Sequence, residues 1–160
     1  LKYKSLEVTN FDKDLEKTVS DLFDTLYASG NGIGLAAPQV GIKKRLIVID
    51  LKEEGKSSPI IFINPKIVSS SNECSINEEG CLSIPGYYAE VKRSNIVEVE
   101  WEGLDRKKKR EKLTGLMSIC IQHEIDHLDG ILFIDYLSNL KKKRAIEKVK
   151  KYKKNNEKTS

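Results

Sequence analysis

Apolar residues spaced three and four positions apart near the start of the chain predict an amphipathic helix. Asn10 and Asp12 precede this stripe and are its candidate N-caps, because a short polar side chain can accept a hydrogen bond from the first turn. The helix is expected to end near Gly30, where glycines interrupt the pattern. Its apolar face is predicted to consist of Leu15, Val19, Leu22, Phe23 and Leu26.

Shorter apolar runs in the middle of the chain predict strands. One run is apolar almost throughout, as in a buried strand, and another alternates strictly between apolar and polar residues. A third contains Pro65, which cannot donate to a neighbouring strand and is expected to break it. Segment 33–39 is too rich in Gly and Pro for a regular element, and the charged run 105–112 is predicted to be a turn with its flanks. The predicted strands are 45–51, 59–68, 88–92 and 96–101.

A second helix is predicted from about residue 114 to residue 129, with Gly130 as its stop. Apolar residues cover more than one of its faces, which indicates a buried helix. One face carries Leu116, Ile119, Cys120, His123 and His127, and another carries Met117, Ile121 and Leu128. A last helix is predicted over 137–154. Strands followed by a central helix, without regular alternation, predict an α+β fold of mostly antiparallel strands around a buried central helix, with a C-terminal helix.

The chain length of 160 residues is typical of one domain, which we expect to span 1–154, with 155–160 as a frayed tail. The sequence contains no apolar run of about 18 residues, the length that a membrane span needs. It begins without Met and without the apolar core of a signal peptide, so the N-terminal segment is expected to be truncated.

Charge and cysteine content narrow the protein class further. Residues 139–160 carry ten Lys and Arg against two Glu, whereas the first 138 residues are mildly acidic. Such a basic tail is typical of a segment that binds an anionic partner, for which nucleic acid is the first candidate. It is equally typical of a solvated helix. The three cysteines are odd in number and lack the spacing of a disulfide framework. This favours a reducing compartment and leaves a thiolate available as a ligand.

Both histidines of the chain lie in one pentapeptide, His123-Glu124-Ile125-Asp126-His127. Residues four apart on a helix project from the same face, so the two imidazoles can bind one divalent ion. Glu124 is placed to exchange protons with a water on that ion. The pattern predicts a hydrolytic metal site, with a helix that binds no metal as the alternative.

Two histidines leave such an ion short of a third protein ligand. Glu147 follows His127 by twenty residues, which is the arrangement of thermolysin-like proteases, but it lies among lysines. Cys81 lies in the glycine-containing segment 79–83, which is predicted to be a tight loop, and its thiolate suits a soft or borderline divalent metal. The residues alone leave both candidates open, together with a purely structural Cys81.

Three segments in register resemble the motifs of peptide deformylases. They are GIGLAAPQ at 32–39, EGCLS at 79–83 and QHEIDH at 122–127, and the similarity continues through 129–133 to the basic terminal helix. Family members usually carry about a dozen more residues in front of the equivalent of Leu1. The resemblance implies a metal-dependent hydrolase that removes the N-formyl group from the N-terminal methionine of new polypeptides and releases formate.

The resemblance also implies a role for each matching residue. Cys81, His123 and His127 would hold the metal, and Glu124 would act as the base. Gln39 and the backbone N–H of Leu82 would stabilise the developing oxyanion. The residues expected to bind the peptide are Ile33, Gly34, Leu116, Ile119 and Cys120. The pair expected to support the site is Glu79 and Arg93.

The cofactor implied by the resemblance is one divalent ion per chain, Fe(II) in cells, with Zn, Ni or Co as substitutes. The expected partners are formylmethionyl nascent peptides and the ribosome, which helix 137–154 would contact. No membrane association is expected. The expected location is the bacterial cytoplasm, with an organelle as the alternative. The sequence leaves two rival functions open: a zinc endopeptidase that uses Glu147, and an RNA- or ribosome-binding protein whose metal is structural.

Overall fold

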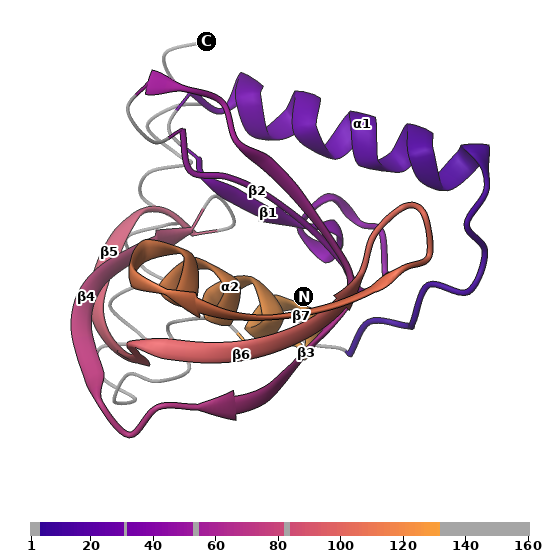
Figure 1. Ribbon diagram of the computed structural model, residues 1–160. Coiled ribbons are helices and arrows are strands. Elements are labelled where there is room, and N and C mark those ends of the chain that lie inside the picture. Colours follow the sequence, from indigo (N-terminus) through magenta and orange to yellow (C-terminus); the bar gives the residue numbers. More distant parts are fainter. Residues whose placement is uncertain (1–3, 31, 53–54, 82–83, 132–160) are drawn as a thin grey trace, which may run out of the picture.

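The computed structural model describes residues 4–30, 32–52, 55–81 and 84–131 (Figure 1). Within these ranges the chain forms two α-helices, one 3₁₀ turn and seven strands. In chain order they are α1 (Lys13–Ala28), β1 (Gly34–Ala36), η1 (Ala37–Val40), β2 (Leu46–Asp50), β3 (Pro59–Ser70), β4 (Cys74–Cys81), β5 (Ile84–Ser94), β6 (Ile96–Glu102), β7 (Lys108–Thr114) and α2 (Gly115–Leu128).

The strands form two antiparallel sheets. One has five strands in the order β1-β2-β3-β6-β7, and the other is the β4–β5 hairpin. Helix α2 lies between them in Figure 1, with β4–β5 on one side and β6–β7 along its length, and it contacts strands of both sheets. The α+β fold with antiparallel strands is therefore confirmed.

Helix α1 forms as the apolar spacing predicts. The Asp12 carboxylate accepts a hydrogen bond from the Leu15 N–H at 3.0 Å, so Asp12 is the N-cap. Its buried residues pack on one face of the five-stranded sheet, against Leu35, Leu46 and Val48. The buried positions of the helix are Leu15, Val19, Leu22 and Leu26.

Helix α2 covers the opposite face of the same sheet. Every residue of β2 is buried because Leu46 and Val48 face α1 whereas Ile47 and Ile49 face α2. The predicted boundaries of α2 are confirmed: Thr114 is its N-cap residue, and Gly130 has the positive φ of 77° that suits a residue after a helix end. Leu116, however, is 52% exposed, so the helix is not buried all round.

Three strands were not predicted from the sequence. The run 105–112 was predicted as a turn and its flanks, but Lys108–Thr114 is the edge strand β7, in which Leu113 alone is buried. Segment 33–39 was given no regular element, yet it contains β1 and most of η1, and β4 was missed entirely. Strand β3 runs through Pro65, whose effect is limited to a register shift between Ile63 and Lys66.

The predicted helix 137–154 and the predicted tail 155–160 lie outside the described residues. Among the residues that the structure describes, neither helix combines the length and apolar character needed to cross a membrane.

Candidate metal centre

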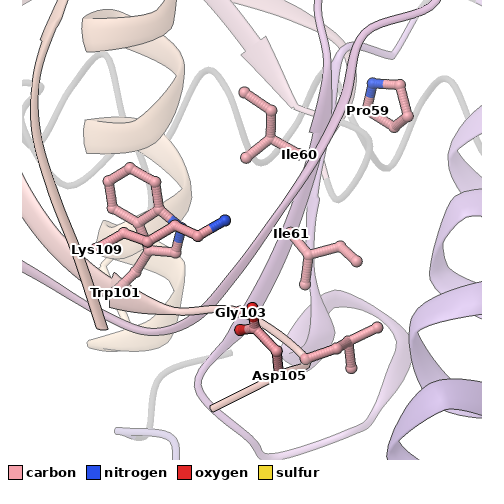
Figure 2. Close-up of a pocket in the computed structure, with 8 residues that line it drawn as sticks. Pro59, Ile60, Ile61, Trp101, Gly103, Asp105 and Lys109 are labelled. Atoms are coloured by element: carbon pink, nitrogen blue, oxygen red, sulfur yellow. The ribbon is translucent and has the colours of Figure 1, made fainter. Parts of the chain in front are cut away.

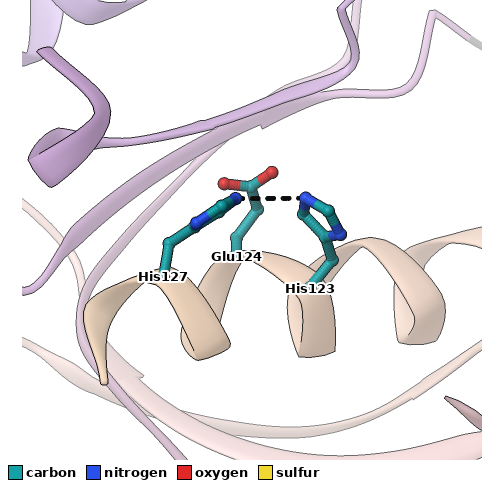
Figure 3. Close-up of side chains that lie close together, drawn as sticks. All are labelled: His123, Glu124 and His127. Carbon is teal, nitrogen blue, oxygen red and sulfur yellow. Dashed lines mark hydrogen bonds between the residues drawn. The ribbon is translucent and has the colours of Figure 1, made fainter. Parts of the chain in front are cut away.

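The two histidines of the chain and the glutamate between them converge on one buried point of α2 (Figure 3). The Nε2 atoms of His123 and His127 are 3.1 Å apart, and the ligand atoms of His123, Glu124 and His127 all lie within 4.8 Å of one another. All three residues are buried. Three potential ligand atoms this close, away from bulk water, form a cluster of the size that one metal ion requires.

The orientation of His123 is set by Glu79 of β4. His123 Nδ1 lies 2.7 Å from Oε1 of Glu79, so the ring proton belongs on Nδ1 and the lone pair on Nε2. Arg93 of β5 binds Glu79 with two hydrogen bonds, from Nε at 2.8 Å and from Nη2 at 2.9 Å. Burial alone would raise the pKa of Glu79, but the hydrogen bonds from Arg93 and His123 outweigh it and hold the pKa at about 2. Glu79 is therefore a carboxylate.

His127 is a neutral imidazole. Its burial lowers its pKa to about 3. A metal ligand must offer a lone pair, so a histidine that stays unprotonated across the physiological range is suited to that role.

Glu124 differs from Glu79 in its surroundings. Burial raises the pKa of Glu124 to about 7, and no group among the described residues hydrogen-bonds its Oε2 atom. A buried carboxylate oxygen without such a partner is costly unless water or an ion satisfies it. The donor set and this unsatisfied oxygen fit a metal ion that carries a water molecule.

Cys81 is the last residue of β4, two positions after Glu79, and its main chain pairs with Ile84 of β5. The sequence indicated a loop at 79–83, whereas Glu79–Cys81 belongs to the strand. The Cys81 side chain, Leu82 and the rival ligand Glu147 lie outside the part that the structure describes.

The first motif packs directly on the helix of the histidines. A Cβ atom built on Gly34 would lie 2.9 Å from Cys120 Sγ and 3.3 Å from Glu124 Oε1, so only glycine fits there without a shift. Gln39 lies in η1, which contacts α2, and its Oε1 accepts a hydrogen bond from the Ala36 N–H at 2.8 Å. Its amide nitrogen therefore faces away from that N–H.

The three residues predicted to form a methionine pocket precede the histidines on α2. Cys120 is buried, Ile119 is half-buried, and Leu116 is 52% exposed. Burial raises the pKa of the Cys120 thiol well above its ordinary value, so this sulfur is a protonated, apolar group.

Sequence reasoning missed two contacts that attach α2 to the β4–β5 hairpin. Asp126 accepts a hydrogen bond from Arg93 Nη1 at 2.5 Å. The Gln122 amide pairs with both main-chain groups of Ser94: Nε2 donates to its carbonyl at 2.8 Å, and Oε1 accepts from its N–H at 3.1 Å. Both residues belong to the 122–127 motif, but their partners lie about thirty residues upstream and no local pattern identifies them.

A pocket of about 400 Å³ is lined by the start of β3, the end of β6, the β6–β7 turn and the start of β7, and it shares no lining residue with this centre (Figure 2). It is lined by Pro59, Ile60, Ile61, Trp101, Gly103, Leu104, Asp105 and Lys109.

Known proteins resemble this chain over almost all of its length. The polypeptide deformylase family model matches residues 1–143. A peptide deformylase of Brucella suis is 53% identical over 152 residues, which cover 94% of this chain and 86% of that protein. One from Rhizobium meliloti is 47% identical, covering 94% and 87%.

Solved structures give the same result. The crystal structure of peptide deformylase from Ehrlichia chaffeensis has a TM-score of 0.91 and 39% identity, covering 97% of this chain and 92% of that one. The structure from Legionella pneumophila has a TM-score of 0.89 and 42% identity, covering 96% and 89%. The chain therefore belongs to the polypeptide deformylase family, the hydrolases that remove the formyl group from the N-terminal methionine of newly made polypeptides.

Proposed function

We propose that His123, His127 and Cys81 hold one divalent ion in this deformylase and that Glu124 is its proton-transfer residue. The observation that carries the proposal is the convergence of two imidazole nitrogens beside a buried carboxylate oxygen that no described group satisfies. Cys81 is the proposed third ligand because it ends the strand whose Glu79 contacts His123. A thiolate with two imidazoles suits Fe(II), Zn, Co or Ni, and we propose Fe(II) in cells.

When bound, the ion acidifies a coordinated water and polarises the formyl oxygen. Glu124 takes the proton from the attacking water and later delivers it to the leaving amine. A pKa of about 7 suits both steps, because the carboxyl can then gain and lose the proton near neutral pH. Burial maintains this pKa and excludes competing water from the carboxylate.

The side-chain amide of Gln39 and the backbone N–H of Leu82 donate hydrogen bonds to the formyl oxygen and stabilise the negative charge that develops on it. The Gln39 carbonyl is bound to the Ala36 N–H, so the donating end of the amide is oriented toward the opposite side. An uncharged donor stabilises the oxyanion without introducing a counter-charge that must be desolvated.

The substrate main chain adds to the edge of the five-stranded sheet at Ile33 and Gly34. Strand β1 is the terminal strand of that sheet, paired with β2 alone among the described strands, and an edge strand can accept an added peptide. Gly34 lies against Glu124, so a peptide bound there has its formyl end at the base. Leu116, Ile119 and Cys120 provide apolar surface for the methionine side chain.

The first experiment measures formate release from formyl-Met-Ala-Ser by anaerobically purified protein of known metal content. Glu124→Ala should lower kcat by roughly 100- to 10,000-fold, the usual contribution of a general base, and leave the metal bound. Cys81→Ser should reduce metal binding, whereas Glu147→Gln should not. The reverse result for the last two variants would favour the endopeptidase-like ligand set.

Metal identity and partner binding are tested separately. The iron form should lose activity in air as Cys81 oxidises, whereas a nickel form should survive.

We propose that helix 137–154, which lies outside the described residues, docks on the ribosome. Replacing Lys141, Lys142 and Lys143 by Glu should weaken co-sedimentation with ribosomes without changing formate release from the tripeptide.

A further inference from the structure

Asp50, the last residue of β2, is a fully buried carboxylate outside the metal centre. Its Oδ1 accepts hydrogen bonds from the backbone N–H groups of Lys52 at 3.0 Å and Ser58 at 2.9 Å. Its Oδ2 accepts hydrogen bonds from two hydroxyl groups, Tyr27 at 2.7 Å and Ser57 at 2.6 Å. Both oxygens are thus fully engaged, and all four donors come from the loop after β2 or from the last turn of α1.

These hydrogen bonds keep the carboxyl ionised despite its burial. Burial alone would raise the pKa of Asp50, but the bonds from Ser57, Ser58, Tyr27 and Lys52 outweigh it and hold the pKa well below its ordinary value. A charged acceptor strengthens each bond, so Tyr27 is attached more firmly than a neutral amide would attach it.

The main chain of the same residue holds the proposed peptide-binding edge. The Asp50 N–H donates to the Ile33 carbonyl at 2.8 Å, one step beyond the β1–β2 pairing, which begins at Gly34 and Ile49. Asp50 therefore holds both ends of the connection between α1 and β1. Its side chain holds Tyr27 at the end of the helix, and its backbone holds Ile33 before the strand.

The position of Ile33 matters because Gly34 follows it directly. Gly34 lies so close to Glu124 and Cys120 that a single added carbon would be 3.3 Å from the Glu124 carboxylate and 2.9 Å from the Cys120 sulfur. A shift of a few tenths of an ångström in β1 would therefore alter the alignment of the Ile33–Gly34 edge with the substrate main chain.

We propose that Asp50, through its bond to Tyr27, is a positioning residue that keeps the Ile33–Gly34 edge in register for binding the substrate main chain. The inference rests on the proposed docking of the formyl peptide at this edge. A positioning role predicts an effect that depends on the part of the substrate beyond methionine. A purely structural role predicts equal losses for every substrate.

Tyr27→Phe is the test variant, because the residue is 39% exposed and the change removes only the hydroxyl. Its KM for formyl-Met-Ala-Ser should rise roughly three- to tenfold, the range for one lost hydrogen bond, with kcat within about twofold of the native value. Both parameters for formyl-Met amide should stay unchanged. Thr25→Val, which removes a hydroxyl from α1 that bonds Asp21, is the matched control and should change nothing.

Asp50→Asn and Asp50→Ala provide a second comparison. In Asp50→Asn the amide oxygen can keep both backbone bonds, and rotated hydroxyls of Tyr27 and Ser57 can accept from the amide nitrogen. The preference for formyl-Met-Ala-Ser over formyl-Met amide should therefore be retained better in Asp50→Asn than in Asp50→Ala.

The outcomes separate the two hypotheses. If native enzyme acts no better on formyl-Met-Ala-Ser than on formyl-Met amide, the docking proposal fails, and this inference fails with it. If native enzyme gains from the extension but Tyr27→Phe loses activity equally on both substrates, or on neither, only the role of Asp50 and Tyr27 is overturned.

Discussion

His123 Nδ1 and Glu79 Oε1 are 2.7 Å apart, although the two residues are 44 positions apart in the chain. One belongs to α2 and the other to the β4–β5 hairpin, so this contact joins the element that carries both imidazoles to the strand that ends at Cys81. The proposed ligand set can converge only while these two elements stay docked. Arg93 supports the same junction by binding Glu79 and Asp126 together.

Glu79→Gln should therefore weaken metal binding about 10- to 100-fold, the usual effect of losing a partner that orients a histidine ligand. The substitution keeps the shape of the side chain but removes the charge that Arg93 and the His123 N–H both contact. Competition with a chelator for Zn or Co measures the affinity. The exposed neighbour Glu78→Gln is the control, and equal affinity in both variants would show that Glu79 does not act on the metal.

Gln39 offers a way to separate its two roles, since its oxygen caps Ala36 while its nitrogen is proposed to serve the oxyanion. Gln39→Glu keeps an oxygen for the Ala36 N–H but has no donor. We expect kcat to fall about 100- to 1000-fold, with the midpoint of thermal unfolding little changed. Gln39→Ala should lose both the rate and some stability. A Gln39→Glu variant that keeps its rate would remove Gln39 from the mechanism.

Gly34→Ala tests how closely β1 must approach α2. The added carbon would lie 2.9 Å from Cys120 Sγ, and this sulfur is buried and cannot move aside freely. We expect kcat/KM to fall at least about tenfold, since small displacements at a reacting centre have large effects. The double variant Gly34→Ala/Cys120→Ala makes room for the added carbon and should recover part of the loss. No recovery would mean that the contact with Glu124 dominates.

The parts of the structure that depend on local spacing were predictable from the sequence. The stripe of α1 and the adjacency of His123 and His127 need only the periodicity of a helix. Strand β7 was missed because its sequence, KKREKLT, is charged and contains one buried residue, and only its pairing with β6 makes it a strand. Strand β1 is only three residues long, so pairing with β2 rather than composition defines it.

The contacts that organise the site were less predictable for the same reason. Asp50 reads in the sequence as the polar end of an apolar run, and nothing nearby indicates that Tyr27, 23 positions earlier, will bind it. Gln122 and Asp126 lie within a motif whose spacing indicates a role only for its histidines. Their partners, Ser94 and Arg93, are on β5. Long-range pairing decides these contacts, and a single sequence does not encode pairing in any local pattern.

The charge of Asp50 predicts a specific dependence of stability on pH. Its pKa in the folded protein lies well below the value of about 3.9 expected in the unfolded chain. Above about pH 5 the group is ionised in both states, and its contribution to the free energy of unfolding is fully present. As the pH falls below that value, the unfolded chain takes up a proton that the folded protein does not, so the contribution is lost.

Asp50→Asn cannot take up that proton, so its stability should lack this component. Urea unfolding at several pH values between 6 and about 3 should show native protein more stable than the variant at the upper end, with the gap narrowing toward the lower end. Asp24→Asn, on the exposed face of α1, is the control for the removal of one carboxylate. A gap for Asp50→Asn that widened on acidification would mean that the carboxyl is protonated in the folded protein, and the hydrogen bonds from Tyr27 and Ser57 would then not hold a charge. Such a result would also weaken the attachment of α1 to the peptide-binding edge, because the strength of that attachment comes from the ionised acceptor.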